Sequence, residues 1–166
     1  GSENKNPESA KRSKSGIIVK GLYDVAVHFS KCCSPVPGDE IVGFVTRGRG
    51  ITIHRTDCIN VLNLPEIERS RLIDAEWQGV EEDNSAATYS TEISIFANNR
   101  IGMFVDISKI FTEREIDIKA MNSRVNKQGK ATITMSFDIH GIEELNNLMA
   151  KLRQIDGVLD IERTTG

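Results

Sequence analysis

The sequence predicts an α+β protein of two small domains: a β-rich domain with three cysteines, followed by a domain with the element order βαββαβ. Short segments of alternating apolar and polar residues fill the first half, which is typical of half-buried strands. In the second half, such segments are joined by two longer ones with apolar residues at helical spacing. The polar segment 79–88 separates the halves, and 166 residues leave room for two small cores.

The first domain is expected to begin at Gly16, after a stretch with almost no apolar residue. That stretch, residues 1–15, predicts a disordered leader, and its opening Gly1-Ser2 resembles a cloning remnant. We therefore expect the chain to be a fragment of a longer protein. Alternation then predicts strands over residues 17–19, 25–29, 41–46, 51–55 and 72–77, with a break at Gly21.

Two turns and one helix complete the first domain. Pro37-Gly38 suits the centre of a tight turn, because glycine adopts positive φ without strain. Residues 47–50 form the loop of a hairpin. A short helix over 59–64 is predicted to be capped by Thr56 or Asp57 and to end before Pro65.

The second domain is expected over residues 89–166. Periodicity predicts, in order, strand 89–97, helix 101–113, strands 116–125 and 130–140, helix 142–155 and strand 158–162. Two helices on one face of a four-stranded antiparallel sheet make a ferredoxin-like arrangement. That fold alone predicts no function.

Composition places the chain among globular proteins of the cytoplasm. The hydrophobic content of 39% and the charged content of 27% are ordinary, and no apolar run is long enough to cross a membrane. No secretory signal opens the chain, and three cysteines, an odd number, do not form the disulfide framework of a secreted domain. We expect reduced thiols and no membrane partner.

One set of residue types has the chemistry of a zinc site. Its members are Cys32, Cys33, His54 and Cys58. Thiolates and imidazoles are the usual ligands of tetrahedral zinc. Adjacent strand residues point to opposite faces, so both neighbouring cysteines reach one ion only if the backbone kinks between them. His28 and Asp57 are spare candidates, and small buried reduced cysteines are the alternative interpretation.

A second candidate site is the basic hairpin over residues 47–55, which contains no acidic residue. Its cationic side chains are those of Arg47, Arg49, His54 and Arg55. Guanidinium groups suit phosphate oxygens, and the two glycines permit close approach of a nucleic acid backbone. Residues 1–78 carry 11 Lys and Arg against 10 Asp and Glu, and residues 79–166 carry 10 against 14, so neither half is a general nucleic-acid binder. A solvated hairpin tip is the alternative.

A third candidate lies where the first strand of the second domain meets its first helix. The predicted ligand-binding residues are Asn99, Ile101, Gly102 and Met103. Amide groups at a helix start attract a carboxylate, and Gly102 leaves room for a small ligand. An ordinary strand-to-helix turn is the alternative. No phosphate-binding GxxxxGK[ST], HExxH or nucleophile elbow is present, so we expect no catalytic activity in this chain.

These segments resemble a known family. Residues 28–43, with 46–51 and 54–58, resemble the conserved-cysteine, zinc-finger-like domain of long RelA/SpoT enzymes. Residues 99–103 and 116–118 resemble the ACT domain that follows it there, although Asn99 stands where many ACT domains have Asp. Together the two resemblances cover about residues 16–165.

The resemblance implies a regulatory role. A parent protein would make guanosine tetraphosphate (ppGpp) from ATP and GTP or GDP, as a GTP pyrophosphokinase, and usually hydrolyse it, in N-terminal catalytic domains absent here. This chain would dock on the ribosome, contacting rRNA and deacylated tRNA, and restrain synthesis when undocked. Zinc is the only cofactor implied, and the ACT domain needs none.

Two alternatives belong to other classes of function. Paired ACT domains could bind a branched-chain amino acid, or the chain could serve only for dimerisation. In each case we expect a homodimer through residues 89–166, because exposed sheet edges can pair.

Overall fold

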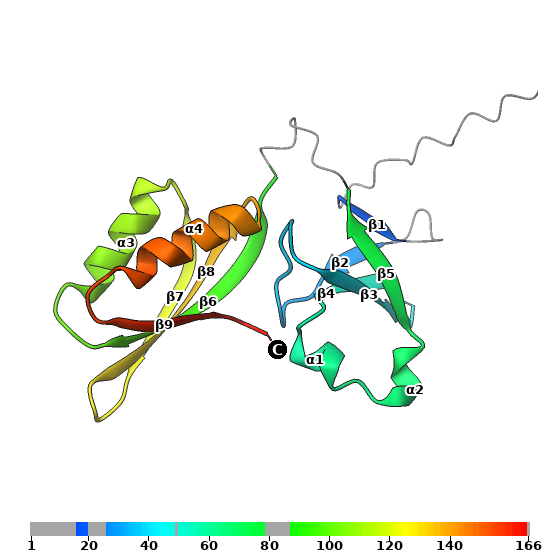
Figure 1. The fold of residues 1–166 in the computed structure, drawn as a ribbon, viewed down its shortest axis with the longest axis horizontal. Coiled ribbons are helices and arrows are strands. Elements are labelled where there is room, and N and C mark those ends of the chain that lie inside the picture. Colours follow the sequence, from blue (N-terminus) through cyan, green and yellow to red (C-terminus); the bar gives the residue numbers. More distant parts are fainter. Residues whose placement is uncertain (1–15, 20–25, 49, 79–86, 166) are drawn as a thin grey trace, which may run out of the picture.

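The structure, a computed structural model, describes residues 16–19, 26–48, 50–78 and 87–165. The predicted leader, the break at Gly21, Arg49 and most of the polar segment 79–88 lie outside the described residues. Figure 1 shows the described part as two domains side by side, each built on its own sheet. No helix in this part of the chain is long and apolar enough to cross a membrane.

The first domain is a five-stranded sheet with the strand order β1-β5-β3-β4-β2. Its strands are β1 (Ile17–Val19), β2 (Val27–Phe29), β3 (Ile41–Thr46), β4 (Gly50–Arg55) and β5 (Leu72–Trp77). Strands β3 and β4 form the predicted antiparallel hairpin, and β2 pairs with β4 in parallel. The alternating side chains of β1, β4 and β5 supply the core, which includes Ile17, Ile51, Ile53 and Ala75.

Two short helices follow the hairpin where the sequence predicted one. Helix α1 covers Ile59–Leu62, and α2, which was not predicted, covers Glu66–Arg69. Pro65 does not terminate α1, which already ends at Leu62. It occupies the position before α2, where its fixed φ suits a helix start. Cys58 is the residue before α1 and makes no side-chain cap, so the predicted capping by Thr56 or Asp57 is wrong.

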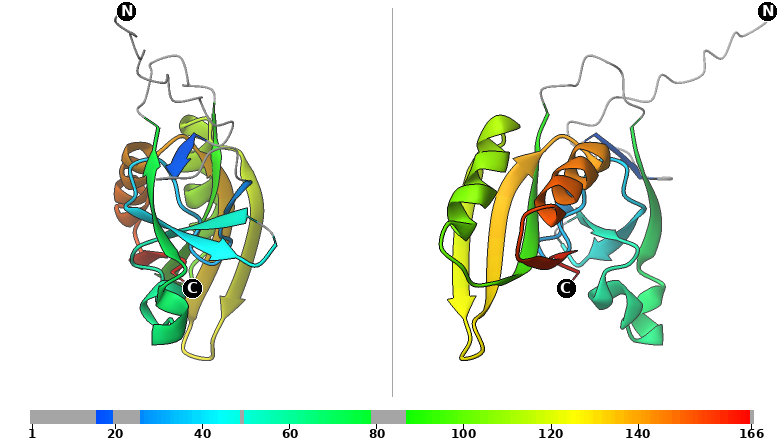
Figure 2. Two further views of the ribbon diagram at one scale, coloured as in Figure 1. Left: turned by 90° about the vertical axis from the view of Figure 1, so that its right-hand side faces the viewer. Right: turned by 60° about the vertical axis from the view of Figure 1, so that its left-hand side comes forward.

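The second domain has the predicted βαββαβ order and the strand order β7-β8-β6-β9, antiparallel throughout. Its elements are β6 (Tyr89–Asn98), α3 (Met103–Glu113), β7 (Ile118–Val125), β8 (Lys130–Ile139), α4 (Ile142–Arg153) and β9 (Val158–Arg163). Alternate residues of β6 and β8 are buried in one core with the apolar faces of both helices. In Figures 1 and 2 the two helices lie on the same face of the sheet.

Helix α3 begins two residues later than predicted. Gly102 has φ +84°, a left-handed conformation that excludes it from the helix. Ile101 consequently lies before the helix and is 99% exposed instead of joining the apolar face. Met103 is the first core residue of α3.

The Pro-Gly turn of the first domain packs directly into the second domain. Val36 is fully buried within the second domain's core, and the N–H of Ile142 donates to the carbonyl of Pro37 at 2.8 Å. A Cβ on Gly38 would overlap the Ile142 side chain, so the close approach requires glycine. A turn predicted only as a chain reversal is therefore the centre of the domain junction.

A buried ion pair fastens the same junction. Arg163, at the end of β9, binds both carboxylate oxygens of Asp39 at 2.7 and 2.8 Å, and their side chains are 10% and 8% exposed. The N–H of Ile59 also donates to the carbonyl of Thr165 at 2.7 Å, so the C-terminal end lies beside α1 (Figure 1). The two domains thus share polar and apolar contacts.

Candidate metal centre and binding loops

The four predicted zinc ligands come from three adjacent segments of the first domain. Cys32 and Cys33 lie in a turn after β2, His54 near the end of β4, and Cys58 just before α1. The N–H of Ser34 donates to the carbonyl of Ser30, and Ser34 has φ +46°. The neighbouring cysteines therefore stand on a tight turn, which supplies the kink that two ligands in succession need.

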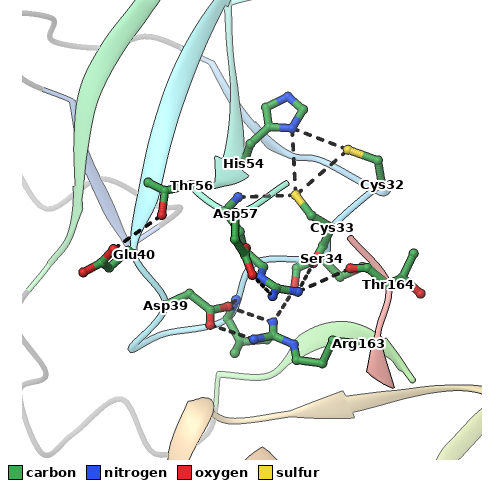
Figure 3. Close-up of polar contacts among 12 residues, drawn as sticks. Cys32, Cys33, Ser34, Asp39, Glu40, His54, Thr56, Asp57, Arg163 and Thr164 are labelled. Carbon is green, nitrogen blue, oxygen red and sulfur yellow. Dashed lines mark hydrogen bonds and ion pairs between the residues drawn. The ribbon is translucent and has the colours of Figure 1, made fainter. Parts of the chain in front are cut away.

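The ligand atoms of these four residues all lie within 4.8 Å of one another. The sulfur of Cys32 is 3.4 Å from His54 Nδ1, 3.4 Å from Cys58 Sγ and 4.0 Å from Cys33 Sγ. Cys33 Sγ lies 3.8 Å from the same His54 nitrogen. Figure 3 shows the imidazole of His54 facing both neighbouring sulfurs.

The separations between these donor atoms fit tetrahedral coordination of one zinc ion. With Zn–S of about 2.3 Å and Zn–N of about 2.0–2.1 Å, donor atoms around one zinc lie about 3.5–3.8 Å apart. The measured separations scatter around that range. The Cys/His cluster could therefore bind a metal ion, and a three-cysteine, one-histidine set closes all four positions of a structural zinc site.

Burial and hydrogen bonding together shift the pKa values of the cluster. Burial raises the pKa of Cys33 to about 12 and raises the pKa of Cys58. Burial also opposes ionisation of Cys32, but hydrogen bonds from neighbouring side chains, Ser30 first, outweigh it, and the Cys32 pKa lies below 9.0. Desolvation lowers the pKa of His54, which favours the neutral imidazole that a metal requires.

Arg55 lies behind the cluster. Its side chain and backbone together are only 7% exposed, and its backbone N–H donates to Cys33 Sγ at 3.3 Å. Its guanidinium donates to the carbonyls of Cys33 and Thr164 and pairs with Asp57 at 2.6 Å. These contacts make Arg55 an outer partner of the candidate site and a bridge to the C-terminal strand. Asp57, which the sequence suggested as an additional candidate ligand, forms this ion pair and is not part of the Cys/His cluster.

The basic hairpin is divided between the surface and the interior. Arg47 is exposed at the end of the hairpin beside Gly48, which has φ +74° and where an added Cβ would meet no atom of the described residues within 4 Å. Arg55 stands at the other end of β4 in the contacts just described, and His54 faces the cysteines. Arg49 lies outside the described residues.

In the second domain, the side chain of Arg100 holds the predicted ligand-binding loop, residues 99–103, by hydrogen bonds and an ion pair. The Arg100 guanidinium donates to the carbonyls of Ile101 and Asp156 and pairs with Asp106 of α3 at 2.7 Å. Asn99 is exposed and its N–H donates to the carbonyl of Gly129 at 2.8 Å. Of the four predicted residues, Met103 is in the core and Ile101 is in solvent, so the loop does not gather them at one point.

Comparison with known proteins gives two successive family matches. Residues 17–78 match the RelA/SpoT RIS domain and residues 85–163 match the ACT domain. The GTP pyrophosphokinase of Escherichia coli strain K12 is 35% identical over 161 residues, which are 96% of this chain and 21% of that protein. The GTP pyrophosphokinase of Streptomyces coelicolor is 32% identical over 150 residues, 90% of this chain and 17% of that protein.

A solved structure, the ACT domain from GTP pyrophosphokinase of Chlorobium tepidum, aligns with 25% identity and a TM-score of 0.42. It covers 46% of this chain and 99% of that one.

These matches define a regulatory region in which a RIS domain precedes an ACT domain. The chain belongs to the RelA/SpoT family and corresponds to the C-terminal regulatory region of its GTP pyrophosphokinases. It spans about a fifth of the length of the curated relatives it matches. In these proteins catalysis lies in other domains than the two matched here.

Proposed function

We propose that this chain is the part of a cytoplasmic (p)ppGpp synthetase/hydrolase that docks on ribosomal RNA and deacylated tRNA and controls synthesis in the stringent response. Its working partners would be the ribosome and the N-terminal catalytic domains of the parent chain. When undocked, the chain would restrain those catalytic domains.

The single observation that carries this proposal is an exposed basic hairpin end on a RIS domain that is joined firmly to an ACT domain. Arg47 is exposed, and residues 47–55 contain no acid to compete with phosphate. A Cβ on Gly48 would meet no atom of the described residues within 4 Å, so a phosphate backbone could approach the main chain there. We assign phosphate contact to Arg47 and Arg49. Arg55, which the sequence analysis grouped with them, has contacts that suit a supporting role.

A structural zinc ion is part of this proposal. Cys32, Cys33, His54 and Cys58 would hold it, and the ion would tie the turn after β2 to the hairpin and to α1. Arg55 would orient Cys33 through its N–H donation to the sulfur. The ion would supply stability, because small domains gain folding free energy from metal binding.

The docking proposal is tested by a salt series of ribosome binding with the double variant Arg47→Ala/Arg49→Ala. Each lost phosphate contact should weaken binding and flatten the salt dependence by about one charge equivalent. The double variant Lys151→Ala/Arg153→Ala, at exposed residues near the end of α4, removes the same charge elsewhere and should change little. Equal ribosome affinity in both double variants would remove the hairpin from the docking surface.

A second candidate function has some support on the ACT domain. Helix α3 exposes Phe104 and Val105, and these residues line an open hollow together with Ser108, Lys109, Thr112 and Glu113. An exposed apolar helix face and β7, an edge strand of the sheet that the described residues form, favour a homodimer, between whose subunits a branched-chain amino acid could bind. Titration with valine or leucine and light scattering separate these alternatives from ribosome docking.

A further inference from the structure

The three thiols of the cluster are not equivalent. Cys32 is half-buried, whereas Cys33 is 1% exposed and Cys58 is fully buried. An oxidant in solution therefore reaches Cys32 first. Its sulfur also lies 2.7 Å from the hydroxyl of Ser30, which is placed to donate a hydrogen bond to it.

Geometry selects the partner of Cys32. The Sγ of Cys58 is 3.4 Å away, and that of Cys33 is 4.0 Å away. Consecutive Cα atoms are about 3.8 Å apart, which is shorter than the about 4.4–6.8 Å that disulfides usually span. Cys33 also accepts the Arg55 N–H at its sulfur, which holds it in place. The backbone N–H groups of Asn60 and Val61 likewise hydrogen-bond to the Cys58 sulfur, so the shorter sulfur–sulfur distance and the separation of Cys58 along the chain are what select it.

We propose that Cys32 and Cys58 form a reversible, oxidation-sensitive dithiol pair whose disulfide is incompatible with metal binding at the same cluster. The disulfide takes two of the four donors, leaving Cys33 and His54, too few for a structural zinc site. Disulfides in reducing compartments are typically transient or redox-sensing, and a cluster of thiols with one accessible member suits that use.

The reaction with a hydroperoxide balances in two steps. The Cys32 sulfur attacks one peroxide oxygen, the O–O bond breaks, and the thiol proton leaves with the other oxygen, which gives water and a sulfenic acid when the oxidant is hydrogen peroxide. The Cys58 sulfur then attacks the Cys32 sulfur, the S–O bond breaks, and the hydroxyl takes the Cys58 proton and leaves as a second water. Two thiols lose two electrons and the peroxide gains them.

The decisive experiment uses the reduced chain, stripped of metal and treated with hydrogen peroxide. Cleavage after Lys31, Arg47, Arg55 and Arg69 places Cys32 and Cys33 in one tryptic peptide, 32–47, and Cys58 in another, 56–69. After alkylation of the remaining thiol, mass spectrometry should find the two peptides joined, with the alkyl group on Cys33. Dithiothreitol should separate them. An alkyl group on Cys32 in the joined peptides, or oxidation of Cys32 to a sulfinic acid without joining, overturns the proposal.

Matched variants test the same assignment by rate. Cys33→Ser should still form the link, and Cys32→Ser should join the peptides about tenfold more slowly or not at all, because its remaining thiols are buried. Equal rates in the two variants would refute the pairing. If a variant folds poorly, the identification of the disulfide by mass spectrometry in the unsubstituted chain still tests the pairing.

A zinc-loaded sample separates this proposal from the metal site itself. Peroxide should release one zinc per disulfide into a colorimetric indicator, and bound zinc should slow the oxidation. A disulfide that forms with zinc retained overturns the incompatibility. Failure of the chain to take up zinc would count against the metal site in the proposed function, while the metal-free experiment would still decide the dithiol pair.

Discussion

Single residues of the Cys/His cluster differ in what they contribute, and the two histidines of the first domain make the clearest comparison. His54 lies 3.4 Å from Cys32 Sγ and 3.8 Å from Cys33 Sγ. His28, the spare candidate from the sequence, is exposed on β2 and is not part of the cluster. One histidine is therefore placed as a ligand, and the other provides a control of the same residue type.

We expect His54→Ala to weaken zinc binding by more than the about 10–100-fold that loss of an outer partner typically costs. His28→Ala should leave the affinity unchanged. Competition with a chromophoric chelator measures both, and elemental analysis should give one zinc per chain for the unsubstituted protein. Similar affinities in the two variants would mean that His54 is not a ligand.

At the scale of elements, the hairpin of β3 and β4 has no room for a side chain at Gly43. A Cβ on this residue would stand 2.8 Å from Ile73 Cγ2 and 2.9 Å from Ile51 Cγ2, both core side chains. The φ of Gly43 is not positive, so its backbone conformation does not require glycine. The neighbouring side chains require it, because they leave no room for a Cβ. The sequence alone shows only a strand weakened by a glycine.

Substitution of Gly43 by Ala should lower the free energy of unfolding by about 1–3 kcal/mol, the usual cost of overpacking a core. Gly48→Ala in the same hairpin has open space and meets only the strain of a left-handed residue, about 1–2 kcal/mol. Urea unfolding gives both values. A second change, Ile73→Leu, removes the Cγ2 methyl and should rescue part of the Gly43→Ala loss and none of the Gly48→Ala loss. Equal effects of Ile73→Leu in both backgrounds would contradict the steric explanation.

At the scale of the whole molecule, the Arg163 to Asp39 ion pair lies in the junction between the domains. These residues are 124 positions apart, and Arg163 also donates to the carbonyl of Ser34, next to Cys33. The carbonyl of Asp39 accepts the indole N–H of Trp77, the only tryptophan, at 3.0 Å. Tryptophan fluorescence therefore reports on this junction.

Replacement of Arg163 by Met should cost about 3–5 kcal/mol of stability, because it leaves a buried carboxylate without its partner. The control is Arg100→Met, whose pair with Asp106 is more exposed and should be worth about 0–1 kcal/mol. Urea unfolding followed by Trp77 fluorescence measures both, and Asp39→Asn completes a double-mutant cycle. A loss for Arg163→Met no larger than that for Arg100→Met would show that the junction does not depend on the ion pair.

The sequence by itself determined the α+β class, the hairpin and the βαββαβ order of the second domain. These features depend on local periodicity, which a chain carries in its own residues. It also identified Cys32, Cys33, His54 and Cys58 as a set with zinc chemistry, because ligand type is a property of the side chain. The extra helix α2 was missed because a proline can follow the end of one helix or precede the start of the next, and only the first of these roles was expected for Pro65.

Only the tertiary structure decided how those residues meet. The turn at Ser34 brings the neighbouring cysteines to one side, and burial makes Arg55 a partner of Cys33 instead of a surface cation. The pairing of Asp39 with Arg163 has no local signal, since contacts between distant residues depend on how the two domains pack. Local pattern specifies elements, whereas burial and distance in three dimensions specify which side chains act together.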